Sequence, residues 1–179
     1  MSGDVYQWLG FEAGQLAFDF LNEVAEDKTM SLDFFAYDLN EPDVVALLEK
    51  LGGRLRAIID NSAKHGLTNS AESRAAKRLS ASAGKENVHR MRFNGLQHNK
   101  VMIAKKDGQP VKVLFGSLNF SFRGFYIQAN NVLVFHEPAA AALFGQVFEL
   151  AFGNPESFSS SPLAKQWHVL PAGKGNDAL

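Results

Sequence analysis

The chain of 179 residues contains no cysteine, which excludes disulfide bonds and thiolate metal sites. No apolar run reaches the ~18 residues that a membrane-spanning helix needs. The first residues, MSGDVYQWLG, lack a basic segment followed by a hydrophobic one, so no signal peptide is expected. Tryptophan and tyrosine are scarce, with two and three residues, whereas fifteen phenylalanines indicate an aromatic core. Together these features predict a cytoplasmic, globular α/β-type protein rather than a secreted or membrane-spanning one.

Charge is almost balanced overall, at −1, but it is unevenly distributed along the chain. Residues 1–53 carry eleven acids and two bases, whereas residues 54–112 carry thirteen bases and four acids. A basic segment suits an anionic ligand, because Lys and Arg attract anions and pair with phosphate oxygens. Charges that are segregated in sequence can also be mixed in space, and the segment is then an ordinary solvated surface. Both interpretations stay open at this point.

Apolar spacing and turn residues predict alternating helices and strands. Helices are expected at 11–26, 42–51, 69–83 and 137–152. Strands are expected at 31–39, 54–60, 89–93, 100–106, 111–116 and 131–135. Helices between the early strands, followed by a hairpin, indicate an α/β fold, a three-layer α/β/α sandwich with a mixed sheet. This domain is expected to span residues 1–152, and the Ser-, Pro- and Gly-rich residues 153–179 to form a linker or C-terminal arm.

The densest group of polar residues lies late in the sequence. It consists of HNK at 98–100, GSLN at 116–119 and QANN at 128–131. Residues two apart on a strand face the same side, so His98 and Lys100 are expected side by side. The predicted hairpin then brings Ser117 and Asn119 to the same edge of the sheet. An imidazole, an ammonium, a hydroxyl and an amide gathered at one edge suit a phosphodiester, which they can attack, neutralise and orient.

HxK followed by GSxN, between strands in this order, resembles the HxK(x)4D…GSxN signature of the phospholipase D superfamily. The resemblance covers residues 10–152, which correspond to one half-domain of that family. It implies that His98, Lys100 and Asn119 are catalytic and that Ser117, Gln128 and Asn130 bind the substrate. It also implies that no metal or other cofactor is needed, and no cluster of acids at metal-ligand spacing lies near His98 in the sequence.

The resemblance implies a phosphodiester hydrolase or transphosphatidylase in which two half-sites face each other. One histidine attacks phosphorus and forms a phosphohistidine, the other protonates the leaving alcohol, and water then hydrolyses the intermediate. This sequence contains one such motif, so the second half-site is expected either in cis, from a following half-domain, or from a homodimer. The substrate is a phosphodiester, which leaves phospholipids and nucleic acids as alternatives.

Two positions depart from the family pattern. Lys105 stands where the family has the Asp of HxK(x)4D, and Asn130 stands where a later acidic residue orients the histidine. A neutral amide cannot stabilise an imidazolium as a carboxylate does. These departures leave a second interpretation open, in which the chain is a non-catalytic, degenerate half that binds phosphate or pairs with an active half.

Overall fold

The computed structural model describes the backbone of residues 3–170 and the side chains of residues 12–170. Its helices are α1 (Gly3–Glu26), α2 (Pro42–Leu51), α3 (Ala71–Ala83), α4 (Phe122–Tyr126), α5 (Pro138–Gly153), α6 (Pro155–Phe158) and α7 (Pro162–Lys165). Its strands are β1 (Met30–Ala36), β2 (Leu55–Asp60), β3 (Val88–Met91), β4 (Val101–Lys106), β5 (Gln109–Gly116) and β6 (Val132–Phe135). Three short 3-10 turns complete the elements, namely η1 (Gly52–Arg54), η2 (Ala63–Gly66) and η3 (Lys85–Asn87).

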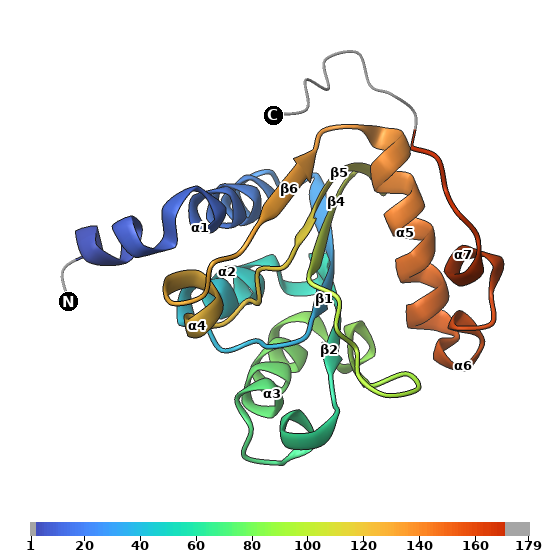
Figure 1. Ribbon diagram of the computed structural model, residues 1–179, viewed down its shortest axis with the longest axis horizontal. Helices are drawn as coiled ribbons and strands as arrows, with labels where there is room; N and C mark the ends of the chain where they lie inside the picture. Colours follow the sequence, from blue (N-terminus) through green and yellow to red (C-terminus); the bar gives the residue numbers. More distant parts are fainter. Residues whose placement is uncertain (1–2, 171–179) are drawn as a thin grey trace.

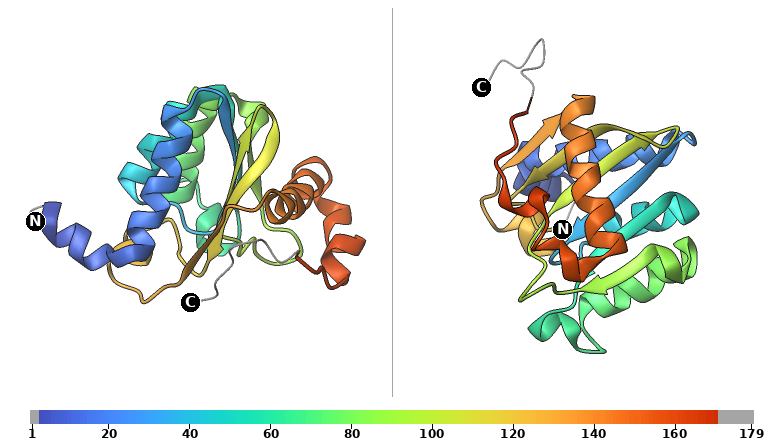
Figure 2. Two further views of the ribbon diagram at one scale, coloured as in Figure 1. Left: turned by 90° about the horizontal axis from the view of Figure 1, so that it is seen from above. Right: turned by 90° about the vertical axis from the view of Figure 1, so that its right-hand side faces the viewer.

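The six strands form one sheet in the order β3-β2-β1-β4-β5-β6 (Figure 1). The pairs β1–β2 and β2–β3 are parallel, whereas β1–β4, β4–β5 and β5–β6 are antiparallel. Figure 2 shows α1, α2 and α3 on one face of the sheet and α5, α6 and α7 on the other. The predicted three-layer α/β/α sandwich with a mixed sheet is therefore confirmed.

Alternation along β1 explains the two hydrophobic layers. Leu32, Phe34 and Ala36 face a core shared with α1, α2, α3 and α4. Phe35 faces the opposite way and packs edge-on against Phe148 of α5, with ring centroids 5.0 Å apart. Because successive strand residues point to opposite faces, this central strand must be apolar on both sides. That requirement accounts for its near-continuous run of buried residues.

Several predicted boundaries differ from those observed. The opening helix starts at Gly3 rather than at residue 11, and the first strand ends at Ala36 rather than at residue 39. Beyond Phe35, β1 no longer pairs with β4, since its partner Val101 is the first residue of that strand. The segment from 37 to 39 therefore turns out of the sheet, and Leu39 makes an isolated bridge to Phe120.

Residues beyond α5 are more structured than an extended linker would be. They form α6 and α7, and Phe158 and Leu170 pack against the core layer that includes α5. The final nine residues, 171–179, lie outside the described part of the chain. The division of the chain at residue 152 stays a prediction. Among the described residues, no helix combines the length and apolarity required to span a bilayer.

Candidate functional site

The segments that carry the polar motifs meet at one edge of the sheet. Val101, the first residue of β4, pairs with Phe35 near the end of β1 and with Phe115 near the end of β5. Val132, the first residue of β6, pairs with Gly116 at the end of β5. Because these neighbours are antiparallel, the residues that precede β4 and β6 lie beside those that follow β1 and β5. The HxK, GSxN and QANN segments are therefore neighbours in space.

The sequence predicted that a strand would hold His98 and Lys100 side by side. Both residues instead precede β4, but their side chains still converge on the same neighbour. Both contact Tyr37, which directly follows β1. The rings of His98 and Tyr37 meet edge to face with centroids 4.5 Å apart, and the ammonium of Lys100 lies 4.9 Å from the centre of the Tyr37 ring. Lys100 is buried and donates to the carbonyl oxygen of His98 at 2.7 Å, whereas His98 itself is exposed. An open imidazole above a buried ammonium can receive an anionic phosphodiester.

The environment of His98 favours its neutral form. The pKa of His98 is lowered, mainly because the ring loses water and secondly because the charge of Lys100 is near. Asp38 and Asp60 act in the opposite direction. Burial likewise lowers the pKa of the Lys100 ammonium, again opposed by the two carboxylates. A histidine with a lowered pKa is unprotonated at neutral pH, and only the unprotonated ring has a lone pair for attack on phosphorus.

A buried hydrogen-bond network fixes the segment that carries His98. Gln97 is fully buried and donates through its side-chain amide to the carbonyl oxygens of Ala36 and Ile58, both at 3.1 Å. Its backbone amide donates to Oδ1 of Asp60 at 2.7 Å, and its Oε1 accepts from the backbone amide of Asn99 at 2.5 Å. Gln97 thus connects the ends of β1 and β2 to the residues on both sides of His98.

The GSxN loop is held by contacts of its own. The Ser117 hydroxyl lies 3.0 Å from Asn130 Oδ1 and 3.0 Å from the backbone amide of Asn131. Gly124 approaches Asn119 so closely that a Cβ on the glycine would lie 2.1 Å from the Asn119 carbonyl oxygen. Only glycine fits at such a contact. Among residues 12–170, the Oδ1 atom of Asn119 is buried without a hydrogen-bond partner, so its acceptor capacity is unused.

Asn130 and Gln128, which the sequence predicts as substrate-binding, have different positions. Asn130 donates to the carbonyl oxygens of Gly124 at 2.9 Å and of Gln128 at 3.4 Å, and it also pairs with Ser117. Its amide is therefore occupied within the loop, and no contact joins it to His98 in the described part of the chain. The side chain of Gln128 is exposed, and its role in binding stays a prediction.

The structure adds a second histidine that the sequence analysis had not singled out. His65 in η2 packs edge to face against Tyr37 with centroids 4.5 Å apart, so Tyr37 contacts two imidazoles. Nδ1 of His65 lies 2.8 Å from Oδ2 of Asp60, and Nε2 lies 2.9 Å from Oδ1 of Asp38. Arg90 holds η2 in place by donating to the carbonyl oxygens of Asp60 and His65. No local pattern marks His65, because its partners come from other segments.

Asp38, His65 and Glu72 are also close enough to hold a metal ion, since one ligand atom from each lies within 4.8 Å of the others. Glu72 is buried and accepts from the backbone amide of Leu39 at 3.3 Å. The three side chains already have contacts of their own, since Asp38 touches His65 and Glu72 touches the backbone. It was not apparent in the sequence because its members come from three separate segments.

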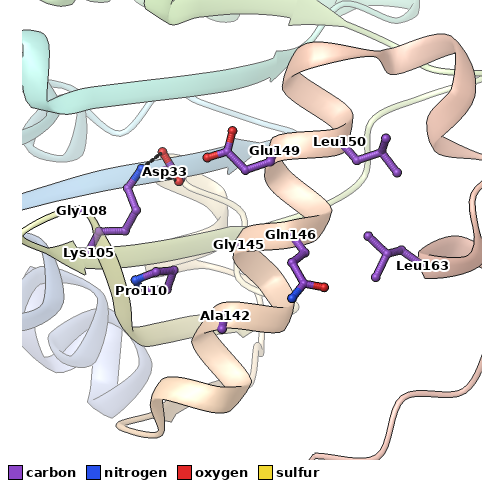
Figure 3. A pocket seen from close by; sticks show the side chains of 10 residues that line it. All are labelled: Asp33, Lys105, Gly108, Pro110, Ala142, Gly145, Gln146, Glu149, Leu150 and Leu163. Atoms are coloured by element: carbon purple, nitrogen blue, oxygen red, sulfur yellow. Dashed lines mark hydrogen bonds and ion pairs between the residues drawn. The ribbon is translucent and has the colours of Figure 1, made fainter.

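Lys105, at the position of the family aspartate, faces away from the site. It pairs with Asp33 at 2.9 Å, and Asp33 is also bound by Arg56 at 2.8 Å. Lys105 and Asp33 line one side of a cavity of about 660 Å³ between α5 and the β4–β5 hairpin, which Figure 3 shows. Lys105 and Gly108 are at the end of the hairpin opposite His98. Lys105 thus fills a structural position beside the α5 layer, away from His98.

Comparisons with known proteins agree on one fold. The sequence profile of the family described as "Cardiolipin synthase, PLD-like domain" matches residues 26–151, whereas no curated protein sequence matches the chain significantly. Nuc from Salmonella typhimurium, titled a phospholipase D family member, is 24% identical with a TM-score of 0.57, covering 74% of this chain and 84% of Nuc. NucT from Helicobacter pylori is 15% identical with a TM-score of 0.50, covering 74% of this chain and 86% of NucT. The polyphosphate kinase from Porphyromonas gingivalis is 12% identical with a TM-score of 0.55, covering 80% of this chain and 21% of the kinase.

Proposed function

Because the chain belongs to the phospholipase D superfamily, with a PLD-like domain over residues 26–151, we propose that it is one half of a phosphodiester-cleaving site with His98 as the nucleophile. The observation that carries the proposal is the pairing of an exposed His98 with the buried ammonium of Lys100 on one tyrosine ring. A buried charge is costly unless it has a task or a partner. Here the ammonium lies where it can neutralise a phosphodiester oxygen.

The reaction proceeds in two steps. An imidazole nitrogen of His98 forms a bond to phosphorus as the bond from phosphorus to the leaving alkoxide breaks, and a proton from the facing half-site goes to that alkoxide. Water then attacks phosphorus and gives a proton back to the facing half-site, while the phosphorus–nitrogen bond breaks and a phosphomonoester is released. If an alcohol replaces water in the second step, the outcome is transfer instead of hydrolysis. The unpaired side-chain oxygen of Asn119 supports a role in orienting a donor group of the substrate or of the facing half-site.

The second half-site comes from another copy of the motif, either in cis or in a homodimer. In-line displacement needs a nucleophile on one side of phosphorus and an acid on the other, and one imidazole cannot occupy both sides. Although His65 lies near His98, both of its ring nitrogens face carboxylates, so it is not free to protonate a leaving group. Light scattering coupled to size-exclusion chromatography, run beside a phosphodiesterase assay, tests this point. Full turnover by a single-motif monomer would contradict the two-half-site arrangement.

The function itself is tested by His98→Ala in the assembled protein, assayed against bis(p-nitrophenyl) phosphate, a phospholipid and single-stranded DNA. Loss of a nucleophile should lower the rate by more than ~10³-fold. His136→Ala is the matched control, because His136 is exposed and follows the far end of β6. A folded His98→Ala protein that keeps more than a tenth of the rate shows a barrier change below ~1.4 kcal/mol, which is too small for a lost nucleophile. That result would favour the non-catalytic, phosphate-binding alternative.

A further inference from the structure

His98 lacks the partner that a catalytic histidine usually has. Among residues 12–170, neither of its ring nitrogens has a hydrogen-bond partner, and its contacts are with Tyr37 and, through its backbone, Lys100. The family carboxylate is replaced by Asn130, whose amide is occupied by Ser117 and Gly124. The orientation and charge of the imidazole must therefore be set by other groups.

Two carboxylates contact His65, which itself packs against Tyr37. Asp60, which is fully buried, contacts Nδ1 of His65 at 2.8 Å, and Asp38, which is partly exposed, contacts Nε2 at 2.9 Å. Each ring nitrogen of His65 therefore faces a carboxylate oxygen. We call these three residues the Asp–His–Asp chain. It is anchored at its buried end by the Ser62 hydroxyl, which donates to Asp60 at 2.6 Å.

Tyr37 connects this chain to His98. The centroid of the Tyr37 ring lies 4.5 Å from that of His65 and 4.5 Å from that of His98. The two imidazole centroids are therefore no farther apart than twice that distance. Edge-to-face packing restricts rotation of each ring. Two edge-to-face contacts through Tyr37, with His65 tied to the buried Asp60, therefore support an otherwise exposed nucleophile.

We infer that the Asp–His–Asp chain positions His98 through the ring of Tyr37 and supplies the negative charge that stabilises His98 when it becomes charged. This inference rests on the proposed role of His98 and deepens it. The charged and titratable groups near His98 are Lys100 on its own segment, Tyr37 and Asp38 after β1, Asp60 at the end of β2, and His65 in η2. Lys100 opposes a positive charge on the ring, whereas Asp38 and Asp60 favour it. Attack on phosphorus leaves the imidazole cationic, so the two carboxylates take over the task of the missing acid.

Asp38→Asn tests the electrostatic part, because it removes one charge and keeps the size of the side chain. The matched control is Asp107→Asn in the β4–β5 turn, at the opposite end of the sheet, where the backbone φ of 49° suits asparagine as well as aspartate. Titration of the His98 imidazole by NMR should give a pKa lower by about 0.5 in Asp38→Asn, as expected for a unit charge removed across one ring in a partly hydrated site. Asp107→Asn should leave that pKa unchanged. In the phosphodiesterase assay, Asp38→Asn should lower kcat roughly tenfold at constant KM.

Tyr37→Leu and Tyr37→Phe test the positioning part. Phenylalanine keeps the ring and should retain kcat, whereas leucine removes it and should lower kcat roughly tenfold without raising KM. If the leucine variant fails to fold, the NMR titration of Asp38→Asn still tests whether the carboxylates influence His98. An identical His98 pKa in the Asp38→Asn, Asp107→Asn and wild-type proteins would overturn the inference. The NMR result does not depend on turnover, so a wild-type protein without phosphodiesterase activity would refute the proposed function while leaving the coupling to His98 separately measured.

Discussion

Asp60→Asn should be among the most damaging isosteric changes in this protein, because Asp60 joins both parts of the site. Its Oδ2 atom accepts from the backbone amide of Ser62 at 3.0 Å, from the Ser62 hydroxyl at 2.6 Å and from His65 at 2.8 Å. Its Oδ1 atom accepts from the backbone amide of Gln97 at 2.7 Å. An asparagine that keeps its oxygen toward Ser62 must turn its NH2 group toward the Gln97 amide, and two donors then face each other in a buried site.

The expected cost follows from these contacts. A hydrogen bond to a charged group contributes about 1.5–3 kcal/mol, and a buried donor left unpaired costs about 1–3 kcal/mol, so we expect a loss of about 3 kcal/mol of unfolding free energy. Burial would raise the pKa of Asp60, but hydrogen bonds from Ser62 and Gln97 outweigh it and lower the pKa. A lowered carboxyl pKa contributes stability above the unfolded value of about 3.9, and that contribution is lost as the pH falls through the folded value. The difference in unfolding free energy between wild type and Asp60→Asn should therefore become smaller at acidic pH.

Equilibrium urea unfolding at pH 7 measures this cost as a change in midpoint at constant slope. Asp107→Asn serves as the surface control and should change stability by less than about 0.5 kcal/mol. The phosphodiesterase rate of Asp60→Asn should also fall, since Gln97 directly precedes His98. A loss below about 1 kcal/mol would refute the reasoning, because it would mean that the four contacts to Asp60 contribute no more than a single neutral hydrogen bond.

Two further predictions follow from the site. Asn130→Asp should lower stability by about 1–3 kcal/mol and should not raise activity, because a carboxylate oxygen would replace the amide that donates to Gly124 and face its carbonyl oxygen. A more active Asn130→Asp protein, measured by kcat and thermal unfolding, would show that the loop can turn this side chain toward His98. Dialysis against EDTA should leave kcat unchanged, since attack by His98 requires no metal; inactivation reversed by added Zn²⁺ would instead assign a cation to Asp38, His65 and Glu72.

The sequence predicted the fold and the family well, for physical reasons. Strand alternation, helix spacing and the turn between β4 and β5 are local properties, and together they indicated a mixed sheet between helical layers. HxK and GSxN also report on long-range structure, because both flank a hairpin whose register brings Val101 opposite Phe115. The superfamily predicted from these two motifs was confirmed by the sequence profile over residues 26–151.

The support around the motif could not be predicted in the same way. Tyr37, Asp60 and His65 lie far from His98 in the sequence, and they meet only because β1 and β2 are parallel neighbours that end at the same edge. His65 stands in a short 3-10 turn without hydrophobic periodicity. The role of Lys105 was equally hidden, since its partner Asp33 lies on a different strand. Such contacts depend on strand order, which local patterns do not determine.

The central claim is that His98 forms a covalent bond to phosphorus, and trapping that intermediate tests it most directly. The assembled protein is mixed with a 32P-labelled phosphodiester, quenched within one turnover in base, where phosphohistidine survives, and digested for peptide mapping. We expect label on the peptide that contains His98, and none in His98→Ala. Turnover that proceeds with label on another residue, or with no covalent label at any quench time, would contradict the account.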